Sequence, residues 1–129
     1  FVNMPARNLF FDTDTSTATE SYYSSLLHEL THWTGSPERL DRVKGKQFGD
    51  DAYAFEELIA ELGATFLCAQ LGISNDVRPD HAQYIKSWIK KLRSDPKFLF
   101  QAASKAQKAI DLLNDYSYET VADDTKVAA

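Results

Sequence analysis

Few cysteines, prolines and glycines occur in this 129-residue sequence, which has one, four and five of them respectively. The single cysteine, Cys68, cannot form an internal disulfide and excludes a multi-cysteine metal cluster, so it is most simply a buried thiol. A reducing, cytoplasmic location is the natural expectation. We find neither repeats nor a low-complexity linker.

Long apolar runs are also missing. No stretch approaches the roughly 18 residues that a membrane span needs, and no basic-then-apolar signal peptide is present. We therefore expect no membrane partner. The sequence starts with Phe1 rather than Met, which is consistent with a fragment or a processed piece. Its 43% hydrophobic and 26% charged residues predict one globular domain over residues 1–118, with a frayed tail at 119–129.

Charge is unevenly distributed, because residues 78–108 carry a net charge of +6 within a chain of net charge −5. Helical spacing brings Lys86, Lys90, Arg93 and Lys97 to one side of this segment. Such a face can bind phosphate groups, but the pattern is more typical of a solvated helix face.

The turn and capping signals predict a mainly α fold with one or two short strands at the start. Residues 1–11 look extended, with Pro5 consistent with a strand edge or a turn. Thr17 and Glu20 form a capping-box pattern that opens a helix ending near Gly35. Further helices are expected over 51–72, 80–95 and 96–116.

The segment "SSLLHELTHWTG" carries two of the three histidines within five positions. On a helix, His28 and His32 lie one turn apart on the same face, so both imidazoles can bind one Zn²⁺ ion. Glu29 is adjacent and can take the proton of a water that the metal activates for attack on a carbonyl. This HExxH pattern, on a helix with uncharged flanks, predicts a metal site rather than two chance histidines.

A catalytic zinc needs a third protein ligand, and the segment "EELIAE" offers Glu56, Glu57 and Glu61. Glu57 and Glu61 share a helix face otherwise lined with alanines, where carboxylates are out of place unless something charged faces them. We assign Glu57 as the third ligand and Glu61 as the carboxylate that orients a histidine N–H, with Glu61 as the alternative ligand. Glu56 is taken as a solvent-facing charge. Gly63 lets the two long helices approach closely.

A di-iron site is the competing interpretation, since Glu29 and His32 also form an ExxH element. Such bundles need a second ExxH. The chain has none, because the residue three positions before His81 is Arg78.

Other candidate site residues are less specific. Tyr53 lies one turn before Glu57 and can hydrogen-bond a developing oxyanion, or it can be a packed tyrosine. His81 can be a transition-state donor, although a surface or capping histidine is commoner. Arg39 and Arg42 can meet substrate carboxylates or phosphates, or pair with Glu38 and Asp41.

Three segments, "ESYYSSLLHELTHWTGSPERLDR", "FGDDAYAFEELIAELGATFLCAQLGI" and "HAQYIKSWIKKLRSDPKFLFQAASKAQKA", resemble the zincin-like metallopeptidase domain of ArdC-type antirestriction proteins. The same domain occurs in TraC-type conjugal primases and in polyvalent proteins of phages and plasmids. "NMP" at residues 3–5 is similar to the start of that domain, and the resemblance covers about residues 2–113.

The resemblance implies a thermolysin-like α+β zincin fold in which the HExxH helix packs against a glutamate-bearing helix. It implies His28 and His32 as zinc ligands, Glu29 as the catalytic glutamate, and Glu57 followed by Glu61. Much of the expected sheet would lie before Phe1, leaving a small or truncated N-terminal sheet. Larger members carry an upstream domain that binds single-stranded DNA, which we do not find in this sequence.

The sequence therefore predicts a zinc-dependent peptidase domain acting on a peptide or protein substrate. The alternative is a non-catalytic, zinc-stabilised module that binds DNA or a restriction-system partner, with residues 78–108 as its working face.

Overall fold

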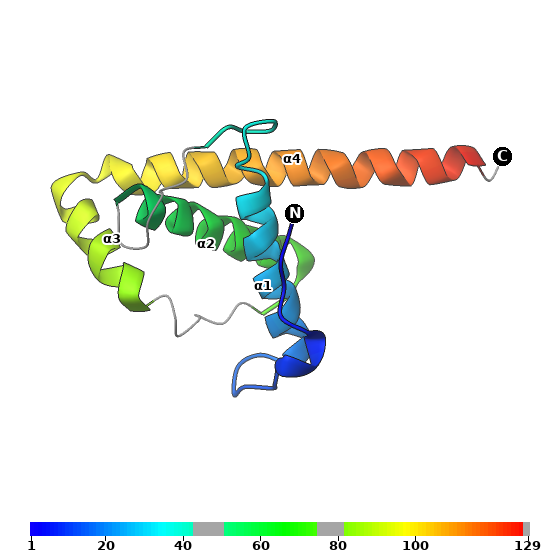
Figure 1. The fold of residues 1–129 in the computed structure, drawn as a ribbon, viewed down its shortest axis with the longest axis horizontal. Helices are drawn as coiled ribbons and strands as arrows, with labels where there is room; N and C mark the ends of the chain where they lie inside the picture. Colours follow the sequence, from blue (N-terminus) through cyan, green and yellow to red (C-terminus); the bar gives the residue numbers. More distant parts are fainter. Residues whose placement is uncertain (43–50, 75–81, 128–129) are drawn as a thin grey trace.

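The computed structural model describes residues 1–42, 51–74 and 82–127. It contains a short 3₁₀ helix, η1 (Arg7–Leu9), and four α-helices: α1 (Ala18–Trp33), α2 (Asp51–Leu71), α3 (Ala82–Ser94) and α4 (Lys97–Val127). Figure 1 shows α4 lying along α2, with α1 crossing them and α3 at the far end of the pair. The predicted mainly α fold is confirmed.

The ends of the helices follow the local sequence. The Thr17 hydroxyl accepts a hydrogen bond from the Glu20 amide, and the Glu20 carboxylate accepts one from the Thr17 amide at 2.9 Å, which is the predicted capping box. Gly72 follows α2 with a φ of +67°, a conformation in which a side chain is strained. At the start of α4, the Asp95 carboxylate accepts a hydrogen bond from the Lys97 amide at 3.0 Å.

Helix α4 continues to Val127, well past Tyr116, where the sequence pattern placed its end. The predicted end was wrong because neither glycine nor proline occurs after Pro96, so no residue breaks the helix.

The short N-terminal strands are also a wrong prediction. Outside η1, residues 1–16 are irregular with a bend, and the Thr13 amide donates a hydrogen bond to the Ser16 carbonyl at 2.8 Å. A strand is stable only when its backbone pairs with a neighbouring strand, and the described residues form none. The small sheet that we expected is therefore not seen in this part of the chain.

Helix α2 lies at the centre of the fold and is buried over much of its length. Leu58 and Ile59 of α2 form a core with Ala102 and Ala106 of α4, and Phe55, Leu62, Trp88 and Phe98 pack around it. Both alanines are fully buried, so small side chains let α4 lie close to α2.

A glycine sets the distance between α1 and α2. A Cβ at Gly63 would lie 2.6 Å from the Cγ2 and Oγ1 atoms of Thr31, which is closer than real atoms approach. The predicted close approach of the two helices is confirmed, and it brings the histidines of α1 next to the glutamates of α2.

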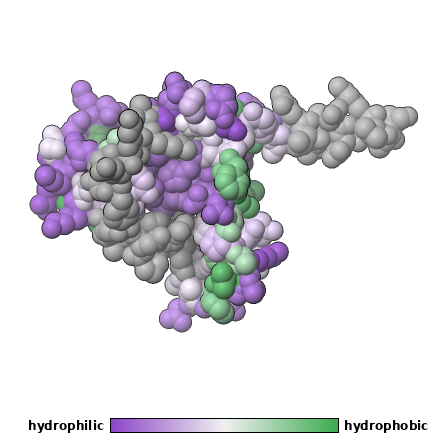
Figure 2. Space-filling view, in the orientation of Figure 1, coloured by the Kyte–Doolittle hydropathy of each residue, from purple (hydrophilic) through white to green (hydrophobic). Residues whose placement is uncertain are grey.

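At the surface, exposed hydrophobic side chains gather on the N-terminal segment beside α1 (Figure 2). They include Phe1, Leu9 and Phe11. None of the described helices has an apolar stretch long enough to cross a membrane.

Candidate metal centre

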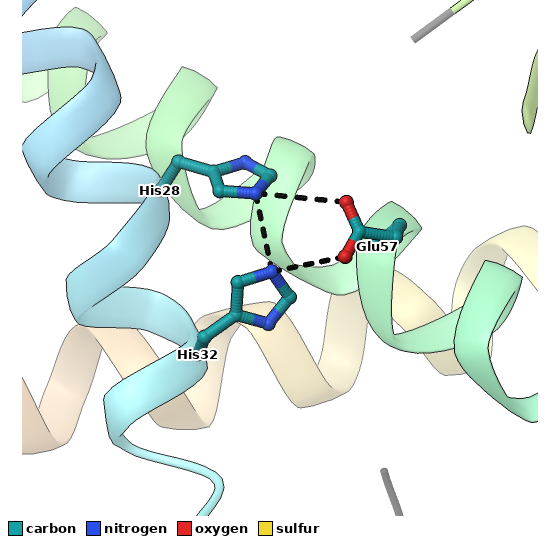
Figure 3. Close-up of side chains that lie close together, drawn as sticks. All are labelled: His28, His32 and Glu57. Atoms are coloured by element: carbon teal, nitrogen blue, oxygen red, sulfur yellow. Dashed lines mark hydrogen bonds and ion pairs between the residues drawn. The ribbon is translucent and has the colours of Figure 1, made fainter. Parts of the chain in front are cut away.

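Three side chains from two helices converge at the crossing of α1 and α2 (Figure 3). The Nε2 atoms of His28 and His32 are 3.1 Å apart. Glu57 presents Oε2 at 3.7 Å from the His28 Nε2 atom and Oε1 at 3.3 Å from the His32 Nε2 atom. The three residues form a group whose donor atoms all lie within 4.8 Å of one another.

These separations fit one tetrahedral metal ion. Zinc binds histidine nitrogen and carboxylate oxygen at about 2.0–2.2 Å, so the ligand atoms of a regular tetrahedron are about 3.3–3.6 Å apart. The His28–His32 and His32–Glu57 Oε1 spacings of 3.1 and 3.3 Å are close to that range, and His28 lies 3.7 Å from the other oxygen of Glu57. Two imidazoles and one carboxylate also form a donor set that suits zinc and related divalent ions.

The far side of His28 faces a second carboxylate. Glu61, one turn after Glu57 on α2, places Oε1 at 2.6 Å from the His28 Nδ1 atom. His28 is 4% exposed, so this contact lies inside the protein. Glu61 therefore lies where it could orient the His28 ring, and the Nε2 atom of His28 lies on the side of Glu57.

His32 is backed by Glu56 rather than by Glu61. Its Nδ1 atom lies 3.2 Å from Glu56 Oε1. Burial lowers the pKa of His32, but hydrogen bonds and negative charge from Glu56 and Glu57 outweigh burial and raise that pKa to about 9. The imidazole is therefore held by a carboxylate on each side.

Glu56 is 4% exposed, so the prediction of a solvent-facing charge was wrong. Its carboxylate accepts two hydrogen bonds from Arg42, from Nε at 2.9 Å and from Nη2 at 2.8 Å. Burial raises the pKa of Glu56, but the hydrogen bonds from His32 and Arg42 hold it below its ordinary value. For Arg42 we expected either a substrate anion or Asp41 as the partner, but its guanidinium forms a buried ion pair with Glu56.

A cleft of about 380 Å³ opens beside the three clustered side chains. Glu29 and Tyr53 line it together with His32 and Glu57. The structure thus brings the predicted base, the predicted hydroxyl donor and two predicted ligands to one cavity. Tyr53 also packs against Tyr84, with ring centroids 5.9 Å apart, so both of its expected roles fit its position.

The remaining candidates lie as follows. Arg39 also lines the cleft, and its guanidinium carbon lies 3.5 Å from the centre of the Trp33 ring. It pairs with Glu38 at 3.1 Å, which is one of the two roles that we expected for it. Cys68 is buried, as predicted, and burial raises its pKa. His81 lies outside the described residues.

The sequence analysis named Glu56 and Arg42 but did not predict that they form an ion pair next to His32. Helical spacing offered a signal for Glu56, because Glu56, Ala60 and Gly63 recur at the intervals that share a face, and Gly63 was expected to face α1. Helical spacing could not place Arg42, because this residue follows α1 on a loop. A hydrogen bond from the Arg42 amide to the Gly35 carbonyl, at 3.1 Å, brings the loop back to the end of α1.

The chain is similar in sequence to proteins of a known family. A sequence model of the zincin-like metallopeptidase family matches residues 1–105. The chain is 44% identical over 109 residues to protein y4eC of Sinorhizobium fredii, covering 84% of this chain and 36% of the relative. It is 43% identical over 124 residues to DNA primase TraC of Escherichia coli, covering 96% of this chain and 11% of TraC.

A solved structure is also similar. The Mn(II)-bound crystal structure of antirestriction protein ArdC from plasmid R388 matches with a TM-score of 0.68 and 47% identity, over 75% of this chain and 36% of ArdC. Its metal-free form matches with a TM-score of 0.66. The chain thus spans about a third of y4eC and ArdC and about a tenth of TraC. The family match and the His/Glu group together indicate a divalent metal cofactor, consistent with the expected Zn²⁺.

Proposed function

Because the chain belongs to the zincin-like metallopeptidase family, we propose that it is a zinc-dependent peptidase domain of an ArdC-type or TraC-type mobile-element protein. The observation that carries this proposal is the convergence of His28, His32 and Glu57, with donor atoms within 4.8 Å of one another, beside a cleft that Glu29 lines. We take a peptide or protein as the substrate and the cytoplasm as the location.

In this proposal His28, His32 and Glu57 hold the ion, which supplies Lewis-acid activation of a water molecule and of the substrate carbonyl. Glu61 and Glu56 keep the two imidazoles turned so that their Nε2 atoms face the ion. Both carboxylates lie on α2, so the helix that supplies the third ligand also orients the other two.

Glu29 is the residue that moves protons. From the cleft wall, its carboxylate accepts a proton as water attacks the peptide carbonyl carbon, and then gives that proton to the leaving amine nitrogen. The C–N bond breaks as the new C–O bond completes a carboxylic acid product, so one water molecule is consumed per bond cleaved. Tyr53, on the same cleft, donates a hydrogen bond to the oxyanion.

Glu29→Gln tests the catalytic part of the proposal. The amide cannot accept the proton, so we expect hydrolysis of a quenched fluorescent peptide library to fall at least 100-fold while metal content is unchanged. Asp115→Asn is the matched control, since Asp115 is an exposed carboxylate on α4. Retained hydrolysis in Glu29→Gln would show that another group is the base.

Elemental analysis tests the metal part. Protein reconstituted separately with zinc and with manganese should retain about one zinc per chain, and His28→Ala and Glu57→Ala should each lose it. If the protein retained manganese but not zinc, the three ligands would stand but the cofactor would be Mn²⁺ rather than Zn²⁺. Loss only in His28→Ala would transfer the third-ligand role from Glu57 to Glu61.

The second candidate function is the non-catalytic binding module, which the charge of α3 favours. Its thirteen residues include four basic and no acidic side chains, of which Lys86, Lys90 and Arg93 are exposed. Figure 2 shows hydrophilic residues gathered over this end of the molecule. For this function, replacing these three with glutamine should abolish binding of a nucleic acid or an acidic partner, and Glu29→Gln should leave that binding intact. For the peptidase function, Glu29→Gln should abolish hydrolysis and the triple replacement should spare it.

A further inference from the structure

Arg42 is a charged residue inside the protein, with 8% of its surface exposed. It follows α1 in the chain, on a loop that turns back at Asp41, which has a φ of +44°. Backbone hydrogen bonds close that loop, from the Leu40 amide to the Thr34 carbonyl at 3.1 Å and from the Arg42 amide to the Gly35 carbonyl at 3.1 Å. The guanidinium is thus returned to the end of α1.

The guanidinium joins the two helices of the metal centre. Toward α2, it donates to both oxygens of Glu56, at 2.9 and 2.8 Å. Toward α1, Nη1 donates to the Thr34 hydroxyl at 2.8 Å and Nη2 donates to the Thr31 carbonyl at 2.7 Å. Four hydrogen bonds in the plane of the fork fix the position of Glu56 relative to the last turn of α1.

Gly35 provides the space for this arrangement. A Cβ at that position would lie 2.8 Å from Arg42 Nη2 and 3.0 Å from Cζ. The guanidinium therefore occupies the volume that a larger residue at position 35 would fill. A guanidinium packed in this way cannot rotate without breaking its hydrogen bonds.

Glu56 Oε1 is the atom that links Arg42 to the metal centre, because it also lies 3.2 Å from His32 Nδ1. An imidazole that donates its Nδ1 proton to this oxygen keeps the lone pair of Nε2 available for a metal. A carboxylate free to rotate would not hold that tautomer or that ring angle.

We propose that Arg42 is a positioning residue of the metal centre, which acts by clamping Glu56 so that Glu56 holds the His32 ring with Nε2 directed at the ion. This inference rests on the metal-binding half of the proposed function and is independent of hydrolysis. The inference also gives the buried Arg42–Glu56 ion pair a purpose other than stability. A buried ion pair is usually no more stabilising than apolar side chains of similar size would be.

Arg42→Lys is the variant that tests the inference. Lysine keeps the positive charge that buried Glu56 requires, but its ammonium cannot make the fork's parallel bonds. We expect zinc affinity, measured by competition with a chelating dye, to fall about 10- to 100-fold, as it does when outer partners of metal ligands are removed. Arg7→Lys, which changes an exposed arginine of η1, should bind zinc as the parent does.

A double variant separates positioning from a general structural role. In a Glu56→Ala background the carboxylate through which Arg42 acts is gone, so adding Arg42→Lys should change zinc affinity less than twofold. An equal loss in both backgrounds would overturn the inference, because Arg42 would then act by another route.

The NMR signal of the His32 ring provides a readout that does not depend on affinity. In zinc-loaded parent protein, the Nδ1–H of His32 should give a slowly exchanging resonance that shifts or broadens in Arg42→Lys. An unchanged resonance together with unchanged affinity would overturn the inference. A parent protein that binds no zinc would instead remove the metal centre itself, so the two failures are distinguishable.

Discussion

At the residue scale, His32 lies between two carboxylates, and that position controls how the site responds to pH. Its pKa is about 9 in the folded chain against an ordinary value of 6.5. A group whose pKa is raised on folding stabilises the folded state fully below its unfolded pKa, and this contribution is lost as the pH rises to the folded pKa. The relevant window is therefore pH 6.5 to 9.

We expect the free energy of unfolding of the metal-free protein to fall by roughly 2–3 kcal/mol across this window. Urea unfolding at pH 6, 7.5 and 9 with a chelator present measures it, and His32→Gln should remove most of the change. Zinc affinity should change in the opposite direction, because the ion binds only the neutral imidazole of His32. We expect that affinity to rise by up to tenfold per pH unit across the window. Metal-free stability that increases over the same window would contradict the assignment.

The residues that sequence alone identified are those that local spacing relates. His28, Glu29 and His32 lie within one turn of a helix, and Glu57 and Glu61 lie one turn apart on another, so their shared faces follow from the helical period. Glu56 and Arg42 are 14 positions apart and do not share a helix, yet their side chains form a buried ion pair. Such pairing depends on the tertiary fold, which no local pattern encodes.

At the element scale, the distance between α1 and α2 depends on the contact between Gly63 and Thr31. Gly63→Ala would place its methyl group 2.6 Å from the Thr31 side chain and push the helices apart. We expect the free energy of unfolding to fall by about 1–3 kcal/mol, and zinc affinity to fall with it, because the ligands come from both helices.

Thermal unfolding and dye competition measure the two effects of Gly63→Ala. The double variant Gly63→Ala with Thr31→Ala is the control, since it removes the side chain that the new methyl group meets. Recovery of zinc affinity in the double variant is expected. A Gly63→Ala variant with unchanged stability and affinity would show that the helices can adjust without cost.

The sequence predicted helix ends correctly where a residue itself imposes a local backbone conformation. It predicted strands wrongly, because whether a strand forms depends on a pairing partner elsewhere in the chain. Thr17 with Glu20, and Gly72, marked helix ends that the structure confirms. Residues 1–11 looked extended, yet among the described residues no strand lies beside them to make a sheet. An extended pattern predicts a strand only if a second strand is available to accept its hydrogen bonds.

At the scale of the whole molecule, the last turns of α4 extend beyond the other helices (Figure 1). Tyr116 still contacts Trp33, with ring centroids 5.7 Å apart, and Asn114 accepts a hydrogen bond from Gln70 at 3.3 Å. We expect a chain that ends at Ser117 to keep its zinc affinity and to unfold within a few degrees of the parent. Calorimetry with and without zinc checks this, and loss of metal binding would assign those turns a part in the site.

The donors come from two segments of the chain, with His32 on one side of the connecting stretch and Glu57 on the other. An ion bound between them would act as a reversible cross-link, which would close that stretch into a loop and restrict the unfolded chain more than the folded one. Loop-closure entropy grows only slowly with length, by about 0.6 kcal/mol per doubling. A change in the length of the connection after Arg42 would therefore cost little in loop-closure entropy. The stretch from Thr34 to Arg42 is different, because its hydrogen bonds hold the Arg42 guanidinium against Glu56.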